Sequence, residues 1–277
     1  MNAIPLLLYA MAGVAYAIHF WQRSARSGQL ATLALGAGSL VHTFIIGMQT
    51  MQVGHVPLAG TTGAISAFVW VLGLAYLYTE MTTGERAMGL FIAPLLVALQ
   101  LIPAIGNSVS ARPPVLESRW FETHVSSLLM AYAAFALACV ISVTYLLLFK
   151  ELKGKHLGVF YARLPSLDNL DRMNSRAVAI GWIFLTVGLT VGGVWLLQVG
   201  SATADPRVQA MSLFDPKIFI VLVCWGVYTF ELYARRAIGW GGRRAALLSA
   251  IGFAILMLNF VPIGYFGTES HNFYTLD

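Results

Sequence analysis

The charged residues of this chain divide it into long uncharged, mostly apolar stretches. A helix needs about 20 mostly apolar residues to cross the hydrocarbon core of a bilayer, and six of the seven uncharged stretches reach that length. The stretches without Asp, Glu, Lys or Arg are 1–22, 27–79, 87–111, 123–149, 177–204, 218–230 and 245–268. The pattern therefore predicts a membrane protein built from spanning helices.

Two of the stretches need closer inspection before the helices are counted. The stretch 27–79 has room for two helices around the polar, glycine-containing segment 49–63. The stretch from residue 218 reaches spanning length only if it includes Glu231, whose carboxylate can reach the interface or pair with Arg235 four residues on. The eight predicted helices cover residues 3–21, 29–48, 64–79, 87–104, 124–149, 177–198, 217–234 and 245–266.

These helices predict an all-α, polytopic membrane bundle. The segments between them are far shorter than an independent domain, so we expect a single integral membrane domain over residues 1–277. The first apolar stretch lacks a basic segment before it, and we interpret it as a span rather than a signal peptide. No internal repeat or low-complexity tract is evident in the sequence.

The distribution of Lys and Arg predicts the orientation. One set of alternating loops carries thirteen of the seventeen basic residues and the other set carries four. The basic set is expected in the cytoplasm, which places both termini outside. We therefore expect a multi-pass protein of the bacterial cytoplasmic (inner) membrane, with the lipid bilayer as its surroundings.

Composition removes several classes of function. The chain is 58% hydrophobic and 10% charged, which excludes a soluble globular enzyme and a disordered protein. The net charge of +5 is explained by the topology signal, so we expect no nucleic-acid partner. The sequence has no metal-ligand cluster, no nucleophile beside a base and no phosphate-binding glycine loop, and we expect no enzymatic activity.

Three histidines are candidates for chemistry. His124 and His271 are each predicted near the outer end of a span, on the same side of the membrane. His42 lies about six residues inside the second span, about 9 Å deep, where it either hydrogen-bonds a neighbouring helix or binds a cofactor. Aromatic residues are predicted to line the surroundings of the outer pair: Trp120, Phe121, Phe214, Phe266, Phe273 and Tyr274. Such a lining suits a flat macrocycle, and histidine is a common axial ligand of haem iron; the aromatic belt of membrane proteins is the competing interpretation.

The segment from Leu164 to Arg172 stands out within the longest predicted inner loop. It has leucines spaced by three, and Ser166 is followed by Asp168 and Asp171. This pattern predicts a capped amphipathic turn or short helix at the inner interface.

Residues from 120 to 277 resemble a known family. The resemblance rests on Gly239–Leu248 with Gly252–Ala254 and His271–Tyr274, on Leu164–Asp171 with Gly181, Leu185–Gly188 and Gly192–Trp195, and on His124 with Ala131–Phe135. These segments resemble the end, the inner loop with its following span, and the histidine-led helix of the cytochrome c assembly family, which includes CcsA, CcmC and HemX-like proteins. Residues 1–110 match only in hydropathy.

The resemblance implies a haem-handling protein. In this family two external histidines flank a tryptophan-rich loop and bind haem iron, and His124 and His271 match those positions. The loop here keeps Asp215, Pro216 and Lys217 but has Phe214 and no tryptophan. Tyr233 aligns where some members have an intramembrane histidine. These departures indicate the HemX-like branch.

Our main hypothesis is a membrane protein of the cytochrome c assembly type that binds or relays haem b. His124 and His271 are the expected iron ligands, Phe214 and Asp215 lie on the loop that caps the site, and Lys217 contacts a propionate. Arg119 is a second propionate candidate, and His42 a further partner from below. The expected partners are other cytochrome c maturation or haem-biosynthesis proteins.

Two alternatives from other classes remain open. A small-solute permease needs broken helices near the midplane, and the glycines of the sixth span could mark such a break, although close helix packing explains them equally. A structural or regulatory membrane partner with a vestigial haem site is the other alternative, because the tryptophans of the loop are absent.

Overall fold

The computed structural model describes residues 2–58, 60–106, 118–155, 158–200 and 216–258. The regular elements in these ranges are all helices, which confirms the all-α fold. They are α1 (Ala3–Gln22), α2 (Ala25–Val53), α3 (Gly60–Thr83), α4 (Gly89–Ile105), α5 (Arg119–Lys153), α6 (Val159–Arg163), α7 (Leu167–Gly200), α9 (Pro216–Ala237) and α10 (Arg243–Leu258).

Six described helices are long and apolar enough to cross a membrane: α1, α2, α3, α5, α7 and α9. The helix α4 has 17 residues and α10 is described over 16, so both are shorter than the others. They nevertheless coincide with the fourth predicted span and with the first part of the eighth. A polytopic membrane bundle is thus confirmed, while the count of eight and the orientation stay predictions.

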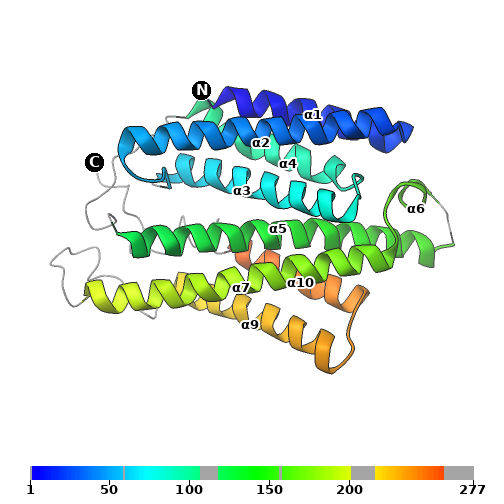
Figure 1. Ribbon diagram of the computed structural model, residues 1–277. Helices are drawn as coiled ribbons and strands as arrows, with labels where there is room; N and C mark the ends of the chain where they lie inside the picture. The colour runs from blue at the N-terminus through cyan, green and yellow to red at the C-terminus, as the bar shows by residue number, and fades with distance from the viewer. Residues whose placement is uncertain (1, 59, 107–117, 156–157, 201–215, 259–277) are drawn as a thin grey trace.

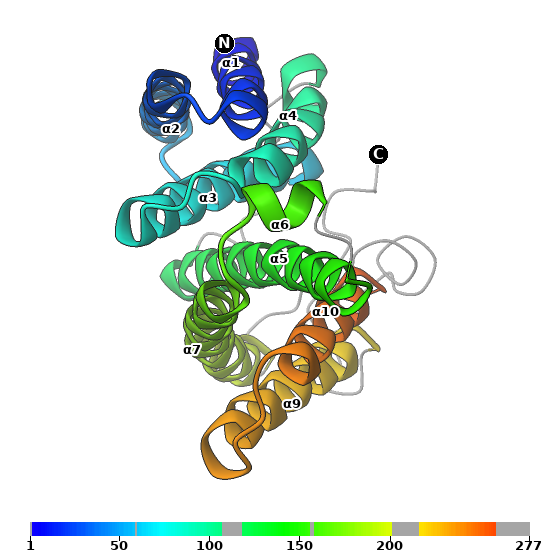
Figure 2. The same ribbon diagram turned by 90° about the vertical axis from the view of Figure 1, so that its right-hand side faces the viewer.

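The long helices lie side by side with their axes roughly parallel (Figure 1). Viewed along the bundle in Figure 2, α1, α2, α3 and α4 form one group, and α7, α9 and α10 lie on the other side of α5. We call the end that carries α6 the inner end, because the charge pattern predicts it to be cytoplasmic, and the opposite end the outer end.

The central position of α5 follows from its sequence. All eight residues from Ala131 to Ala138 are buried, and six of them are alanine or leucine. Small side chains let neighbouring helices approach on every side, and a helix that is apolar all round is expected in a core. Ala133 packs toward the α1–α4 group, while Phe135 stacks on Tyr228 of α9 with ring centroids 3.8 Å apart. α5 therefore joins the two groups.

The segment predicted as a separate interfacial turn is the beginning of a spanning helix. Ser166 caps it, since its hydroxyl oxygen accepts a hydrogen bond from the Asn169 backbone N–H at 3.2 Å. The helix that starts at Leu167 is α7, and it continues to Gly200. The capping prediction is confirmed, and the expected separate element at the interface is replaced by the first turns of α7.

Two glycines of α7, Gly181 and Gly188, serve packing against α5. The helix runs unbroken through Gly181, Gly188, Gly192 and Gly193, the four glycines of the sixth predicted span. A Cβ atom at Gly181 would collide with the ring of Phe135 on α5, and a Cβ atom at Gly188 would collide with Leu128, also on α5. These glycines allow α5 and α7 to approach closely, as the packing alternative predicts. The permease alternative loses its main sequence support.

Candidate functional site

His124 lies near the outer end of α5 and contacts α7. The helix starts at Arg119 after Ser118, whose hydroxyl oxygen accepts a hydrogen bond from the Trp120 N–H. The imidazole Nδ1 of His124 is 2.7 Å from the backbone oxygen of Gly188. Because a carbonyl oxygen can only accept, Nδ1 is the protonated nitrogen, and the neutral ring has its lone pair on Nε2.

The absence of a side chain at Gly192 makes this hydrogen bond possible. In a helix the Gly188 carbonyl already faces the N–H four residues on, so a second donor must approach it beside residue 192. The His124 ring occupies that space, and a Cβ atom at Gly192 would collide with ring atoms Nδ1 and Cε1. Two helices therefore fix the orientation of one imidazole.

An aromatic pair lies one turn further toward the outer end. The rings of Phe121 on α5 and Trp195 on α7 have their centroids 5.9 Å apart. Trp195 is 6% exposed, and its indole Nε1 has no hydrogen-bond partner in the part of the chain that is described. A buried N–H donor without an acceptor is costly, and such a group is a candidate for binding a ligand.

Trp195 was not among the site residues proposed from the sequence. A signal was available, because Gly188, Gly192 and Trp195 follow the spacing i, i+4, i+7 that places residues on one helix face. This spacing identifies Trp195 as a site residue only once it is known that this face of α7 meets the face of α5 that carries Phe121 and His124.

Several predicted site residues fall where the structure gives no placement. His271, Phe214 and Asp215 lie outside the described residues, so the meeting of His124 and His271 stays a prediction. Lys217 is the second residue of α9, and Arg119 is the exposed first residue of α5.

His42 is completely buried in the α1–α4 group. Its Nε2 is 2.9 Å from the hydroxyl of Ser66 on α3, and its Nδ1 is 3.1 Å from the hydroxyl of Tyr9 on α1. The structure thus contains the hydrogen-bonded alternative for this residue. Iron could bind His42 only after one of these bonds opened, and its role as a ligand remains a prediction.

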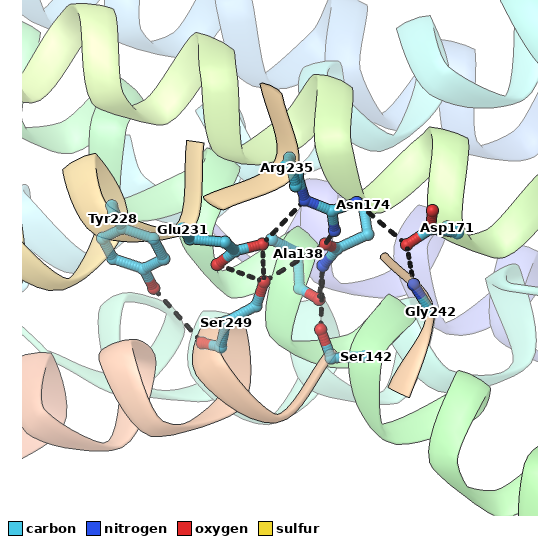
Figure 3. Close-up of polar contacts among 9 residues, drawn as sticks. All are labelled: Ala138, Ser142, Asp171, Asn174, Tyr228, Glu231, Arg235, Gly242 and Ser249. Atoms are coloured by element: carbon cyan, nitrogen blue, oxygen red, sulfur yellow. Dashed lines mark hydrogen bonds and ion pairs between the residues drawn. The ribbon is translucent and has the colours of Figure 1, made fainter. Parts of the chain in front are cut away.

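A second polar cluster lies toward the inner end, where α5, α7, α9 and α10 meet (Figure 3). Its centre is the guanidinium of Arg235, which uses all three nitrogens. Nη1 donates to Asp171 at 2.9 Å, Nη2 to the side-chain oxygen of Asn174 at 2.6 Å, and Nε to Glu231 at 3.2 Å. The Arg235 side chain is 10% exposed, so this is a buried ion-pair network.

Hydroxyl and amide groups complete the network. The Ser249 hydroxyl lies 2.9 Å from each carboxylate oxygen of Glu231. Asn174 donates to the Ser142 hydroxyl at 2.8 Å and to the Ala138 carbonyl at 3.1 Å. These bonds link four helices at one level of the bundle, and a buried network whose members are satisfied rigidifies the packing around it.

The sequence anticipated part of this cluster. The pairing of Glu231 with Arg235 is confirmed, although Glu231 is fully buried and does not reach the interface. Tyr233 lies two residues along α9, 60% exposed, on a different face. The position aligned with the family's intramembrane histidine therefore points away from the ionic network.

The arginine-rich turn between α9 and α10 also joins the network. Gly242 has a positive φ of 57°, a conformation that glycine adopts without strain, and its N–H donates to Asp171 at 2.9 Å. The segment that carries part of the family resemblance is thus held against α7.

Together these features define a polytopic helical membrane protein with an oriented histidine at one end of its central helix pair and an ionic network toward the other. The chain belongs to the cytochrome c assembly protein family, whose sequence model matches residues 4–273. The match extends the resemblance to the first 110 residues, where hydropathy had been the only likeness.

Known relatives agree with this membership. The chain is 23% identical to the cytochrome c biogenesis protein CcsA of Trieres chinensis, over 97% of this chain and 94% of that protein. It is 25% identical to the CcsA protein of Prochlorococcus marinus strain MIT 9303, over 98% and 92%. It is 26% identical to that of Chlamydomonas reinhardtii, over 90% and 69%. The protein is therefore a membrane protein of the cytochrome c assembly type, and its assignment to a HemX-like branch stays a prediction.

Proposed function

We propose that the protein binds haem b at its outer end and relays it during cytochrome c assembly. His124 and His271 would be the axial ligands of the iron. Family membership supports a role in cytochrome c assembly, and so do the CcsA relatives, which are named cytochrome c biogenesis proteins. Location in a bacterial inner membrane, with other maturation or haem-biosynthesis proteins as partners, belongs to the same proposal.

The observation that carries the proposal is the hydrogen bond from His124 Nδ1 to the Gly188 carbonyl. Histidines that bind metals usually donate their other ring nitrogen to a carbonyl or carboxylate, which fixes the tautomer and the ring orientation. Here the fixed tautomer leaves Nε2 with its lone pair, and no partner of Nε2 is found within the described ranges.

The neighbouring residues fit a haem ligand. The unpartnered Trp195 indole N–H can donate to a propionate, and Phe121 supplies a flat apolar surface beside it. Lys217 and Arg119 are the proposed cationic contacts for the propionates, with Phe214 and Asp215 on the capping loop. Bound haem supplies an iron that accepts two imidazole nitrogens, and the protein's residues orient those nitrogens and neutralise the carboxylates. The role consists of binding and release, so no enzymatic activity is proposed.

The test is a haem titration of the purified protein in detergent. We expect His124→Ala to weaken haem binding at least tenfold and to remove the low-spin absorption bands of a six-coordinate iron. The matched control is His55→Ala, because His55 is a second histidine outside the predicted membrane core, bonded only to the Val56 carbonyl among the described residues. Equal haem affinity and spectra for wild type and His124→Ala would refute the proposal.

A colourless protein that co-purifies with a partner in haem-replete cells would instead support the regulatory alternative. In that case haem would neither bind to the wild type nor change its stability.

A further inference from the structure

A long apolar groove runs along the side of the bundle. It has a volume of about 920 Å³ and is lined mainly by α3 on one side, α7 on the other and α5 between them, with Ile46 and Thr50 of α2 also in the lining. On α3 the lining extends from Ala67 to Thr83, a rise of about 24 Å at 1.5 Å per residue. Its base contains buried apolar residues of α5, including Leu129 and Leu137.

The groove opens sideways rather than into the bundle. Exposed apolar side chains from all three helices lie among its lining residues: Leu74, Met130 and Ile180. In a membrane protein such a surface faces hydrocarbon, because neither water nor an empty space is stable against it. The chemistry of the groove walls therefore requires an apolar occupant.

A basic side chain lies at the inner end of this apolar groove. Arg176 on α7 is exposed and lines the groove together with Tyr78 and Thr82 near the inner end of α3. Elsewhere in the described residues, Arg172 pairs with Asp168 and Arg235 pairs with its two carboxylates. Arg176 has no ion pair within those ranges.

From this juxtaposition we infer that the groove binds an anionic phospholipid of the inner leaflet. The phosphate pairs with the Arg176 guanidinium, the Tyr78 hydroxyl can donate a further hydrogen bond, and an acyl chain lies along α3 and α5. Arginine suits phosphate because its planar donors match two oxygens at once, and anionic lipids are enriched on the cytoplasmic side.

The shape and charge of the groove favour a lipid over a porphyrin. A slot about 24 Å long suits an extended chain better than a compact ring. One guanidinium matches one phosphate, whereas a porphyrin such as haem carries two carboxylates. The inference does not depend on the proposed haem site, which lies at the outer ends of α5 and α7.

The experiment is native mass spectrometry of the detergent-purified full chain titrated with phosphatidylglycerol or phosphatidylcholine. We expect the wild type to retain phosphatidylglycerol in preference, and Arg176→Gln to lower its affinity about tenfold while the affinity for phosphatidylcholine is unchanged. The control is Arg172→Gln, which removes an arginine one turn away that pairs with Asp168 and does not line the groove. It should bind both lipids as the wild type does.

A second variant tests the apolar part. Ala179 lines the groove and is only partly buried, so Ala179→Leu should fill space there without disrupting the core, and it should lower the retention of both lipids. Equal binding of phosphatidylglycerol by wild type and Arg176→Gln would overturn the inference. Loss of bound haem, or of a dimer, in these variants without any change in lipid binding would also overturn it, because the occupant would then be a porphyrin or a second copy of the chain. A negative result for His124→Ala leaves these outcomes unaffected.

Discussion

Replacing Gly192 by alanine tests whether the orientation of His124 matters for haem. The new Cβ atom would collide with atoms Nδ1 and Cε1 of the imidazole, and α7 could move away from the ring only by giving up its extensive contact with α5. The ring must therefore rotate out of its place. Its hydrogen bond to the Gly188 carbonyl, 2.7 Å long, is lost.

The magnitude follows from that lost bond. Removing the partner that orients a metal-binding histidine typically lowers metal affinity by 10- to 100-fold, and we expect a rise of about that size in the Kd for haem. The substitution also replaces a glycine inside a helix by alanine, and this replacement by itself stabilises a helix by about 1 kcal/mol. Gly192→Ala should therefore weaken haem binding without a large loss of stability from α7 itself.

Gly193 provides the matched control for this substitution. It is the next residue of the same helix, and a Cβ atom there meets nothing within 4 Å. Gly193→Ala gains the same helix propensity but leaves the imidazole in place, so its Kd for haem should equal that of the wild type. The assay is a haem titration followed by absorption, with thermal unfolding of each variant in detergent. If Gly192→Ala and Gly193→Ala bind haem equally well, the orientation of His124 by α7 has no role in binding.

Two further substitutions test the buried polar clusters. Arg235→Gln leaves the fully buried Glu231 without its cationic partner and should lower the free energy of unfolding in detergent by about 3–5 kcal/mol. Arg236→Gln, at the exposed neighbouring position, should change the free energy of unfolding by less than about 0.5 kcal/mol. Equal stabilities of the two variants would show that the network contributes nothing. His42→Ala removes both hydrogen bonds of the imidazole and should lower the free energy of unfolding by about 1–3 kcal/mol. The haem absorption spectrum should stay unchanged. Loss of that spectrum would instead identify His42 as an iron ligand.

The fold could be predicted because bilayer thickness constrains sequence strongly. Uncharged stretches of spanning length located α1, α2, α3 and α5 to within about five residues at each end, and the stretch extended through Glu231 located α9. For α7 only the outer end was located. The error at α7 has a physical cause. Residues 167–176 are polar and charged, so hydropathy placed them in a loop, yet their Ser166 cap and the ion pair between Asp168 and Arg172 allow the helix to start ten residues earlier.

The candidate site could be predicted only where one residue type carried the signal. His124 was proposed because aromatic residues are predicted near it and because it matches a histidine position of the cytochrome c assembly family. Trp195 and the partners of Arg235 on other helices were missed, because their significance depends on which helix faces pack together. Asn174 and Ser249 are ordinary polar residues in the sequence, and only the meeting of α7, α9 and α10 makes them parts of one network.

The central claim of the proposed site is that two imidazoles, those of His124 and His271, bind one iron. The measurement is the absorption and electron paramagnetic resonance spectrum of the protein purified from haem-replete cells, compared with His124→Ala, His271→Ala and the double variant. We expect a low-spin, six-coordinate signal in the wild type, a change to high spin in each single variant, and no bound haem in the double variant. A double variant that keeps the wild-type spectrum would contradict the assignment of both ligands.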